Sequence, residues 1–87
     1  MLGINILKHN QKKISLHFSK KNCSWRNYKF FFSLYKVPML ENSLVNLECK
    51  SIKHYNAGDH IIFIMKVINS KISETGRPMI YYNNKYK

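Results

Sequence analysis

The sequence predicts a mainly β fold, built from antiparallel strands with one or two short helices. Two long segments, Ser43–Tyr55 and His60–Ile72, have the apolar patterning of strands, and a short aromatic strand, Met79–Tyr82, follows them. Turn-forming residues separate these segments, with Asn56–Asp59 between the first two and Thr75–Pro78 before the third. Strands that follow one another across short turns favour antiparallel pairing.

The N-terminal part of the chain predicts a strand followed by a helix. Apolar residues recur in Gly3–Leu7 often enough for a short strand. Asn10 has the side chain expected of a helix N-cap, which places the helix over Gln11–Ser19. Ile14 and Phe18 then lie on one face of this helix and give it an apolar side for packing.

The middle of the chain is less regular. Residues 20–28 are polar and predict an irregular segment. Residues 29–37 are rich in phenylalanine and tyrosine and fit either a strand or a packed loop. Pro38 favours a break after them, because proline has no backbone N–H to donate to a sheet.

The two long predicted strands differ in their pattern. In the first, Val45, Leu47 and Cys49 share one face, and the residues between them are polar. The second is apolar on both faces between Ile61 and Met65, which is typical of a central strand in a barrel.

The chain is strongly basic, with a net charge of +11 from fifteen Lys and Arg against four Asp and Glu. Such an excess attracts anions, so nucleic acid has to be weighed as a partner. The basic residues are scattered, however, and nearly all are lysine, which lacks the planar fork of arginine. A solvated basic surface is therefore favoured over nucleic-acid binding, although the positive field can still steer an anionic nucleotide.

Length and cysteine content narrow the class of protein. Eighty-seven residues allow one small domain, residues 1–87, with a thin core. Cys23 and Cys49 are far apart and do not suggest a disulfide framework, which favours a reducing, cytoplasmic location.

No apolar run is long enough to span a membrane, so no membrane association is expected. The histidines and cysteines lack the paired spacing of a zinc site, so no metal is expected.

Several short motifs occur in a characteristic order. Leu47-Glu48-Cys49 is followed by Gly58-Asp59-His60, an apolar strand, the segment Arg77–Tyr82 and finally Tyr86. Upstream, Gly3–Leu7 ends in an asparagine-x-leucine pattern. This order resembles the C-terminal half of the flavin reductase-like domain, the FMN-binding split barrel of NAD(P)H:flavin oxidoreductases and of the reductase components of two-component monooxygenases.

The resemblance implies a partial, antiparallel FMN-binding split β-barrel. In this family, serine, threonine and small residues upstream of the asparagine-leucine segment cradle the FMN phosphate and ribityl chain. Met1 stands almost directly at that segment, so residues 1–87 are expected to be a truncated domain that lacks its N-terminal part. The chain alone is then expected to bind FMN weakly or not at all.

The resemblance also implies the cofactors and partners of the whole domain. These are FMN or FAD as the bound flavin, NAD(P)H as co-substrate, a homodimer if the full domain is present, and a monooxygenase partner. Hydride transfer between two cofactors needs orientation rather than a nucleophile, so no catalytic triad is expected.

Three residues are candidates for the site. The resemblance places His60 near the flavin ring on the nicotinamide side, as the catalytic candidate and a cofactor contact; the alternative is a histidine bonded to the turn. Lys29 could pair with phosphate and Phe30 could cover a flavin edge, or they are an exposed lysine beside a core phenylalanine. Asn5, within an apolar strand, is expected to satisfy backbone groups rather than contact cofactor.

Two hypotheses from different classes remain. The first is a flavin reductase-like, FMN-binding protein related to NAD(P)H-dependent flavin oxidoreductases, in a truncated or inactive copy. The second is a non-enzymatic, basic, β-rich module that binds an anionic or protein partner. A flavin absorbance band on the purified protein would distinguish them.

Overall fold

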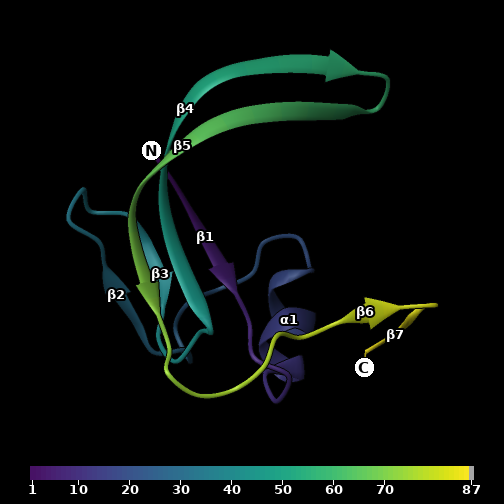
Figure 1. The fold of residues 1–87 in the computed structure, drawn as a ribbon. Helices are drawn as coiled ribbons and strands as arrows, with labels where there is room; N and C mark the ends of the chain where they lie inside the picture. Colours follow the sequence, from purple (N-terminus) through teal and green to yellow (C-terminus); the bar gives the residue numbers. More distant parts are fainter. Residues whose placement is uncertain (87) are drawn as a thin grey trace.

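The computed structural model describes residues 1–86, in which seven strands and one short helix form (Figure 1). The strands make one three-stranded sheet and two separate two-stranded hairpins, and every pairing between named strands is antiparallel. The predicted fold class, mainly β and antiparallel with one helix, is confirmed. No helix among these residues is long and apolar enough to cross a membrane.

The three-stranded sheet contains β1 (Leu2–Ile6), β4 (Val45–Ala57) and β5 (His60–Ile72), with β4 in the middle. All three strands were predicted from the sequence, and β4 begins and ends two residues later than expected. The turn between β4 and β5 consists of Gly58 and Asp59 alone. Gly58 has φ of 64°, in the left-handed region that glycine adopts most readily.

β1 pairs only with the first part of β4, from Ile6 opposite Val45 to Leu2 opposite Cys49. Beyond Cys49, residues 50–66 continue as a two-stranded hairpin that curves away from the rest of the sheet (Figure 1). We call residues 50–66 the arm. The pairing register shifts by one residue at Ile52 of β4, which has no partner in β5. It also shifts by one residue at Ile68 of β5, which has no partner in β4 and lies where the arm joins the sheet.

A second hairpin covers one face of β4. It consists of β2 (Phe30–Phe32) and β3 (Pro38–Leu40), with Phe31 opposite Met39. The aromatic segment that fitted either a strand or a loop is therefore a strand followed by a turn. Pro38 is the first residue of β3, a position where a missing N–H is tolerated.

The core is thin, as the chain length predicted. Its buried apolar side chains are Met39, Leu40 and Cys49. Three polar side chains are buried with them, namely Ser43, Asn46 and Glu48. The polar face of β4 is therefore also an interior face, because β2 and β3 lie over it.

Asn5 holds two strands together, as expected from its place in an apolar strand. Its Oδ1 accepts hydrogen bonds from the Leu40 backbone N–H at 3.1 Å and from Asn46 Nδ2 at 2.7 Å. The Asn46 amide also donates to the Leu40 carbonyl at 3.0 Å. The side chains of β1 and β4 thus satisfy the backbone at the end of β3.

The helix α1 (Lys12–Phe18) is shorter than predicted. Its N-cap is Gln11 rather than Asn10, so that part of the prediction is wrong. The side chain of Gln11 makes no capping hydrogen bond to the helix. Instead, its Oε1 accepts a hydrogen bond from the backbone N–H of Lys8 at 2.7 Å. This closes the turn that leads into the helix and leaves Asn10 outside it.

The C-terminal segment forms a third hairpin, β6 (Tyr81–Tyr82) with β7 (Lys85–Tyr86). The predicted strand Met79–Tyr82 is therefore too long. Met79 instead donates its backbone N–H to the Leu7 carbonyl at 3.0 Å, just after β1. Between the strands, Asn83 and Asn84 have φ of 53° and 60°, the left-handed pair that a two-residue hairpin turn requires.

Candidate functional site

His60 lies at the tip of the arm, at the first residue of β5. Its side chain is 80% exposed, and its Nδ1 lies 2.5 Å from Asp59 Oδ1 in the neighbouring turn. The carboxylate holds one ring nitrogen, and among the residues that the structure describes Nε2 has no hydrogen-bond partner. The histidine is therefore both fastened to the turn and accessible to a ligand.

Lys29 and Phe30 lie at the start of β2. Lys29 is exposed, and its carbonyl accepts a hydrogen bond from the Glu41 backbone N–H at 3.0 Å. The ring of Phe30 packs edge-on against Trp25 and Phe32, with centroids 5.4 Å and 5.6 Å apart. Phe30 nevertheless keeps 39% of its surface exposed, so one side of the ring is free for contact.

The three candidates do not converge within this chain. The tip of the arm and β2 lie well apart in Figure 1. None of the cavities described here is lined by His60, Lys29 or Phe30. These four cavities therefore do not bring the three side chains together around one flavin.

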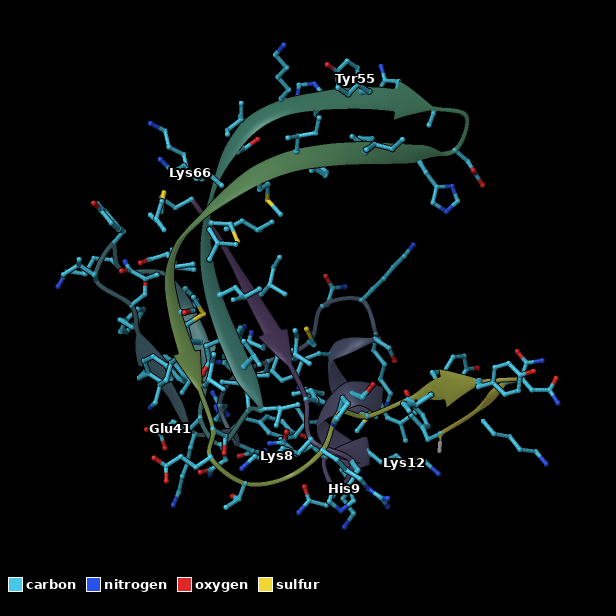
Figure 2. All side chains as sticks on the ribbon, in the orientation of Figure 1. Lys8, His9, Lys12, Glu41, Tyr55 and Lys66 are labelled. Carbon is cyan, nitrogen blue, oxygen red and sulfur yellow. The ribbon has the colours of Figure 1, made fainter. Side chains whose placement is uncertain are left out.

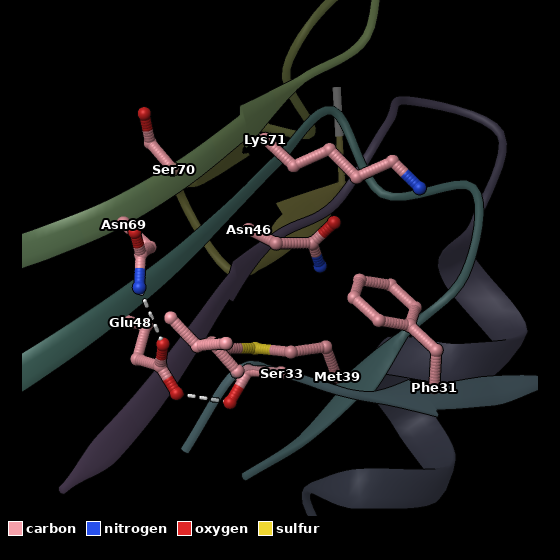
Figure 3. A pocket seen from close by; sticks show the side chains of 9 residues that line it. Phe31, Ser33, Met39, Asn46, Glu48, Asn69, Ser70 and Lys71 are labelled. Atoms are coloured by element: carbon pink, nitrogen blue, oxygen red, sulfur yellow. Dashed lines mark hydrogen bonds between the residues drawn. The ribbon is translucent and has the colours of Figure 1, made fainter. Parts of the chain in front are cut away.

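A buried carboxylate that the sequence analysis did not single out as a site lies between β2 and β4. Glu48 is 1% exposed, and both of its oxygens accept hydrogen bonds (Figure 3). Asn69 Nδ2 donates to Oε1 at 2.9 Å, the Tyr35 backbone N–H donates to Oε2 at 3.3 Å, and the Ser33 hydroxyl also donates to Oε2. Glu48 lies between Leu47 and Cys49 in the first, buried part of β4, and a carboxylate between these two apolar residues is the signal that could have identified it.

The surroundings of Glu48 set its protonation state. Burial by itself would raise the pKa of this carboxyl group. The hydrogen bonds from Ser33, Asn69 and the Tyr35 amide, together with the positive charge of the N-terminus, outweigh burial, so the pKa lies below its ordinary value. Glu48 is consequently ionised at neutral pH and suits an anchoring role better than general-base catalysis.

The cavity beside Glu48 has a volume of about 230 Å³. Its walls are Phe31, Ser33, Leu34, Met39, Asn46, Glu48, Asn69, Ser70 and Lys71 (Figure 3). Lys71 lies over the ring of Phe31, with Nζ 4.7 Å from the centroid. The carboxylate is already satisfied by donors from the chain itself, so the network fastens the turn after β2 to the sheet.

A larger groove, of about 820 Å³, lies between α1 and the C-terminal hairpin. It is lined by Lys12, Leu16, Ser19, Tyr81, Asn84, Lys85 and Tyr86. Tyr86 closes one wall, because its hydroxyl lies 2.9 Å from Ser15 Oγ and its ring lies under Lys12 Nζ at 5.6 Å. Two lysines and two tyrosine rings give this groove a basic and aromatic character.

Metal-binding groups do not gather in the part of the chain that the structure describes. No set of three or more His, Cys, Asp or Glu side chains is positioned there to hold an ion. Cys23 is half-buried and Cys49 is buried, and both are free thiols. Cys49 acts as the small core residue that its place on the apolar face of β4 predicted.

Comparison with known proteins identifies relatives over the whole chain. The family described as "Flavin reductase like domain" matches residues 1–87. An NADH-dependent flavin reductase from Rhodococcus is 31% identical over 85 residues, which cover 98% of this chain and 47% of the relative. The reductase component of 4-hydroxyphenylacetate 3-monooxygenase from Klebsiella oxytoca is 24% identical over 98% of this chain and 53% of its own length.

Solved structures give the same result for the fold. The NADH:FAD oxidoreductase of Streptomyces globisporus, in complex with NAD and FAD fragments, superposes with a TM-score of 0.91 at 21% identity, over 98% of this chain and 53% of that one. The styrene monooxygenase flavin reductase of Pseudomonas putida gives a TM-score of 0.85 at 25% identity, over 98% and 55%. The chain therefore spans about half the length of the relatives that it matches.

Proposed function

Because the chain belongs to the flavin reductase-like domain family, we propose that it forms about half of a flavin-binding domain and takes part in the reduction of FMN or FAD by NAD(P)H. The observation that carries this proposal is the family match over all of residues 1–87. The relatives indicate which cofactor is reduced and which is oxidised, since one of them is an NADH-dependent flavin reductase. In such a reaction the bound flavin accepts the hydride, and the protein orients the two cofactors.

Each candidate residue has a distinct task in this proposal. His60 contacts the flavin–nicotinamide region, because its ring is held by Asp59 while the rest of the side chain stays accessible. Lys29 pairs with a phosphate, and the exposed side of Phe30 covers a flavin edge. The His60 ring and the start of β2 lie apart, so these tasks require further polypeptide between them.

The residues present do not make a complete flavin site on their own. An FMN phosphate has several oxygens that each need a donor once water is removed, and an unsatisfied buried phosphate is costly. Lys29 is the sole phosphate candidate among the three, and no cavity described here encloses it. We therefore propose that residues 1–87 alone bind FMN weakly and that the other half of the domain supplies the phosphate donors.

The partners follow the same reasoning. Two relatives are components of monooxygenase systems, namely the reductase of the 4-hydroxyphenylacetate enzyme and the styrene monooxygenase reductase. We propose that the complete domain works as a homodimer and passes reduced flavin to a monooxygenase component.

A titration of FMN, followed by flavin fluorescence, tests the proposal. The purified chain should quench little, and its affinity for FMN and for riboflavin should be similar, because it lacks the phosphate donors. Addition of the unmatched half of the Rhodococcus relative should give stoichiometric quenching and a preference of about tenfold or more for FMN over riboflavin, equivalent to one additional phosphate contact or more. Tight FMN binding by the chain alone would show that the site is misplaced, and no binding by the mixture would refute the function.

A second candidate is a non-enzymatic module that binds an anionic partner. What favours it is that, within residues 1–86, no lysine or arginine lies within 4.0 Å of a carboxylate oxygen. Basic side chains also lie near the start of α1, where Figure 2 labels Lys8, His9 and Lys12. If the mixture described above binds flavin, the flavin-binding half-domain is supported. If the mixture does not bind flavin, the non-enzymatic module remains as the explanation.

A further inference from the structure

A small polar cavity lies at the end of the three-stranded sheet where β1 and β5 finish and β4 begins. Its volume is about 150 Å³. Two lysines line it together with asparagines and serines, and the full set is Lys8, Asn42, Ser43, Asn46, Lys71 and Ser73. None of these side chains is a carboxylate, and none belongs to the flavin-site candidates. The wall therefore has the composition of a site for an anion rather than for an apolar ligand.

Backbone hydrogen bonds hold the elements around this cavity together. The Leu44 N–H donates to the Ile6 carbonyl at 2.8 Å, and the Ser73 N–H donates to the Leu44 carbonyl at 2.8 Å. The end of β1 and the end of β5 therefore lie on either side of the start of β4. Asn46 and Lys71 are directly opposite each other in this sheet. Because much of the wall is built on strand ends, its side chains are positioned more precisely than loop residues would be.

Both lysines have side chains that other parts of the fold hold in place. The stem of Lys8 lies against the backbone of Gly76, since a Cβ added to this glycine would be 2.9 Å from Lys8 Cδ. Gly76 has φ of 100°, which favours glycine at this position and keeps the space for the lysine stem open. Lys71 Nζ is held 4.7 Å from the ring centroid of Phe31. Side chains that are ordered in advance lose less entropy when an anion binds.

The charges of these two lysines are not neutralised by a neighbouring carboxylate. Within residues 1–86, no carboxylate oxygen lies within 4.0 Å of Lys8 or Lys71. Glu41 and Glu74 are next in sequence to residues of the wall, but neither of them lines the cavity. The net charge of +11 adds a field that attracts anions to the whole molecule.

A buried acceptor in the wall distinguishes one kind of anion from another. Asn46 is 5% exposed, and its Nδ2 donates to Asn5 Oδ1 and to the Leu40 carbonyl. Its Oδ1 accepts no hydrogen bond from residues 1–86. In this part of the chain, no fully buried side-chain oxygen or nitrogen lacks a partner, so the Asn46 Oδ1 must be reachable from the cavities that Asn46 lines. This oxygen needs a donor, which a ligand with a hydroxyl group can supply.

We propose that this cavity binds inorganic phosphate. The ammonium groups of Lys8 and Lys71 bind its charged oxygens, and the side-chain amide of Asn42 adds a neutral donor. Near neutral pH, phosphate keeps at least one proton, which it donates to Asn46 Oδ1. Sulfate has no proton to donate and would leave this acceptor without a partner, which is costly in a buried site.

The size of the cavity supports the free ion as the ligand. A volume of about 150 Å³ is well below the roughly 300–1,000 Å³ of pockets that enclose larger molecules, so the cavity cannot enclose a nucleotide. Bound phosphate would link Lys8, which follows β1, to Lys71 near the end of β5. It would thereby stabilise the folded chain in proportion to its concentration and affinity.

The test titrates the full 87-residue chain with phosphate and, separately, with sulfate at neutral pH and constant ionic strength. NMR shifts of the Asn46 side-chain amide and of the Ser43 and Ser73 backbone amides report binding at the cavity, and the thermal midpoint reports stabilisation. Phosphate should bind about tenfold or more tightly than sulfate, as expected for one additional hydrogen bond. No flavin is added, so failure of this proposal is distinguishable from failure of the proposed flavin chemistry.

Charge-matched variants localise the anion. Lys8→Gln and Lys71→Gln should each weaken phosphate binding by about tenfold or more. Lys53→Gln removes the same charge from the exposed arm and should change the affinity by less than about twofold, because salt screens distant charges. The proposal is overturned if phosphate does not bind, if sulfate binds as tightly, or if the three variants weaken binding equally. Tighter binding of glycerol phosphate than of inorganic phosphate would also overturn it, because the ligand would then be a phosphate ester.

Discussion

The hydroxyl group of Ser33 donates a hydrogen bond to the carboxylate of Glu48, fifteen residues further along the chain. The same hydroxyl oxygen accepts a hydrogen bond from the Val37 backbone N–H at 3.0 Å. Ser33 thus joins the turn that follows β2 to the buried part of β4, and Glu48 is the ionised group at the centre of that junction.

This junction predicts an acid-sensitive contribution to stability. The pKa of Glu48 is lowered in the folded state from an ordinary value of 4.5, so its contribution is fully present above that pH. It is lost as the pH falls from about 4.5 through the lower folded-state pKa. The free energy of unfolding, measured with denaturant between pH 6 and pH 3, should fall less with decreasing pH for Glu48→Gln than for the unmodified chain. Equal pH dependence of the two proteins would contradict the assignment.

Gly3→Ala should destabilise the chain by about 1–3 kcal/mol, a typical cost of overpacking. A Cβ at Gly3 would lie 2.9 Å from Val37 Cγ1 and 3.0 Å from Met39 Sδ. The methionine can move aside, but valine is stiff. Val37→Ala removes the closest atom, so the double variant should lose less stability than the sum of the two single variants. Simple additivity in the unfolding free energies would exclude this clash.

Tyr86→Phe should loosen the C-terminal hairpin from α1. The change removes the hydroxyl that lies 2.9 Å from Ser15 Oγ, at a cost of about 0.5–1.5 kcal/mol. Tyr82→Phe is the control, because Tyr82 is 69% exposed and lies in the same hairpin. Faster hydrogen exchange in residues 79–86 for the first variant alone is the expected result, and equal effects would count against the contact.

The isolated chain is expected to be marginally stable or prone to aggregate, because the arm presents an uncharged strand with a free edge. Replacement of Ile62 and Ile64 by lysine should raise the protein concentration at which light scattering begins. Leu34→Lys adds a charge elsewhere and should raise it less. A sharp, cooperative melt from a monodisperse monomer of the unmodified chain would refute this expectation.

In a domain restored by the complementing half, His60→Ala should slow NAD(P)H oxidation more than it weakens FMN retention. The ring is accessible at the tip of the arm and is one contact among many for the flavin. The rate of NAD(P)H oxidation should fall by about tenfold, which is about 1.4 kcal/mol in activation free energy, while the affinity for FMN should change by less. His54→Ala is the matched control on the same arm, where the ring packs near Phe63. Equal losses for both variants would assign His60 a structural role.

Much of the sheet could be predicted from the sequence, because strands are indicated by the local alternation of apolar residues and by the turn-forming residues between them. β4, the Gly58 turn and β5 were located in this way. The helix was located too, but its N-cap was not, since the side chain of Gln11 reaches back to Lys8. The short hairpin β6–β7 was missed, although Asn83 and Asn84 were a usable signal for its turn.

The candidate site was less predictable for a physical reason. Alternation shows which residues share a face of β4, but it cannot show that β2 and β3 cover the polar one. The burial of Glu48 depends on contacts with Ser33 and Asn69, which lie on other elements of the fold. The separation of His60 from Phe30 likewise depends on the curvature of the arm rather than on any local pattern (Figure 1).

The register shift at Ile52 reverses the odd–even order of β4. Before it, odd-numbered Ser51 lies on the same face as Cys49; after it, odd-numbered Tyr55 lies on the opposite face, across from Ile62. One inserted or deleted residue at this point would therefore turn the whole tip of β4 over, while most substitutions there would not. For this chain, the number of residues between Cys49 and Gly58 constrains the arm more tightly than their identity does.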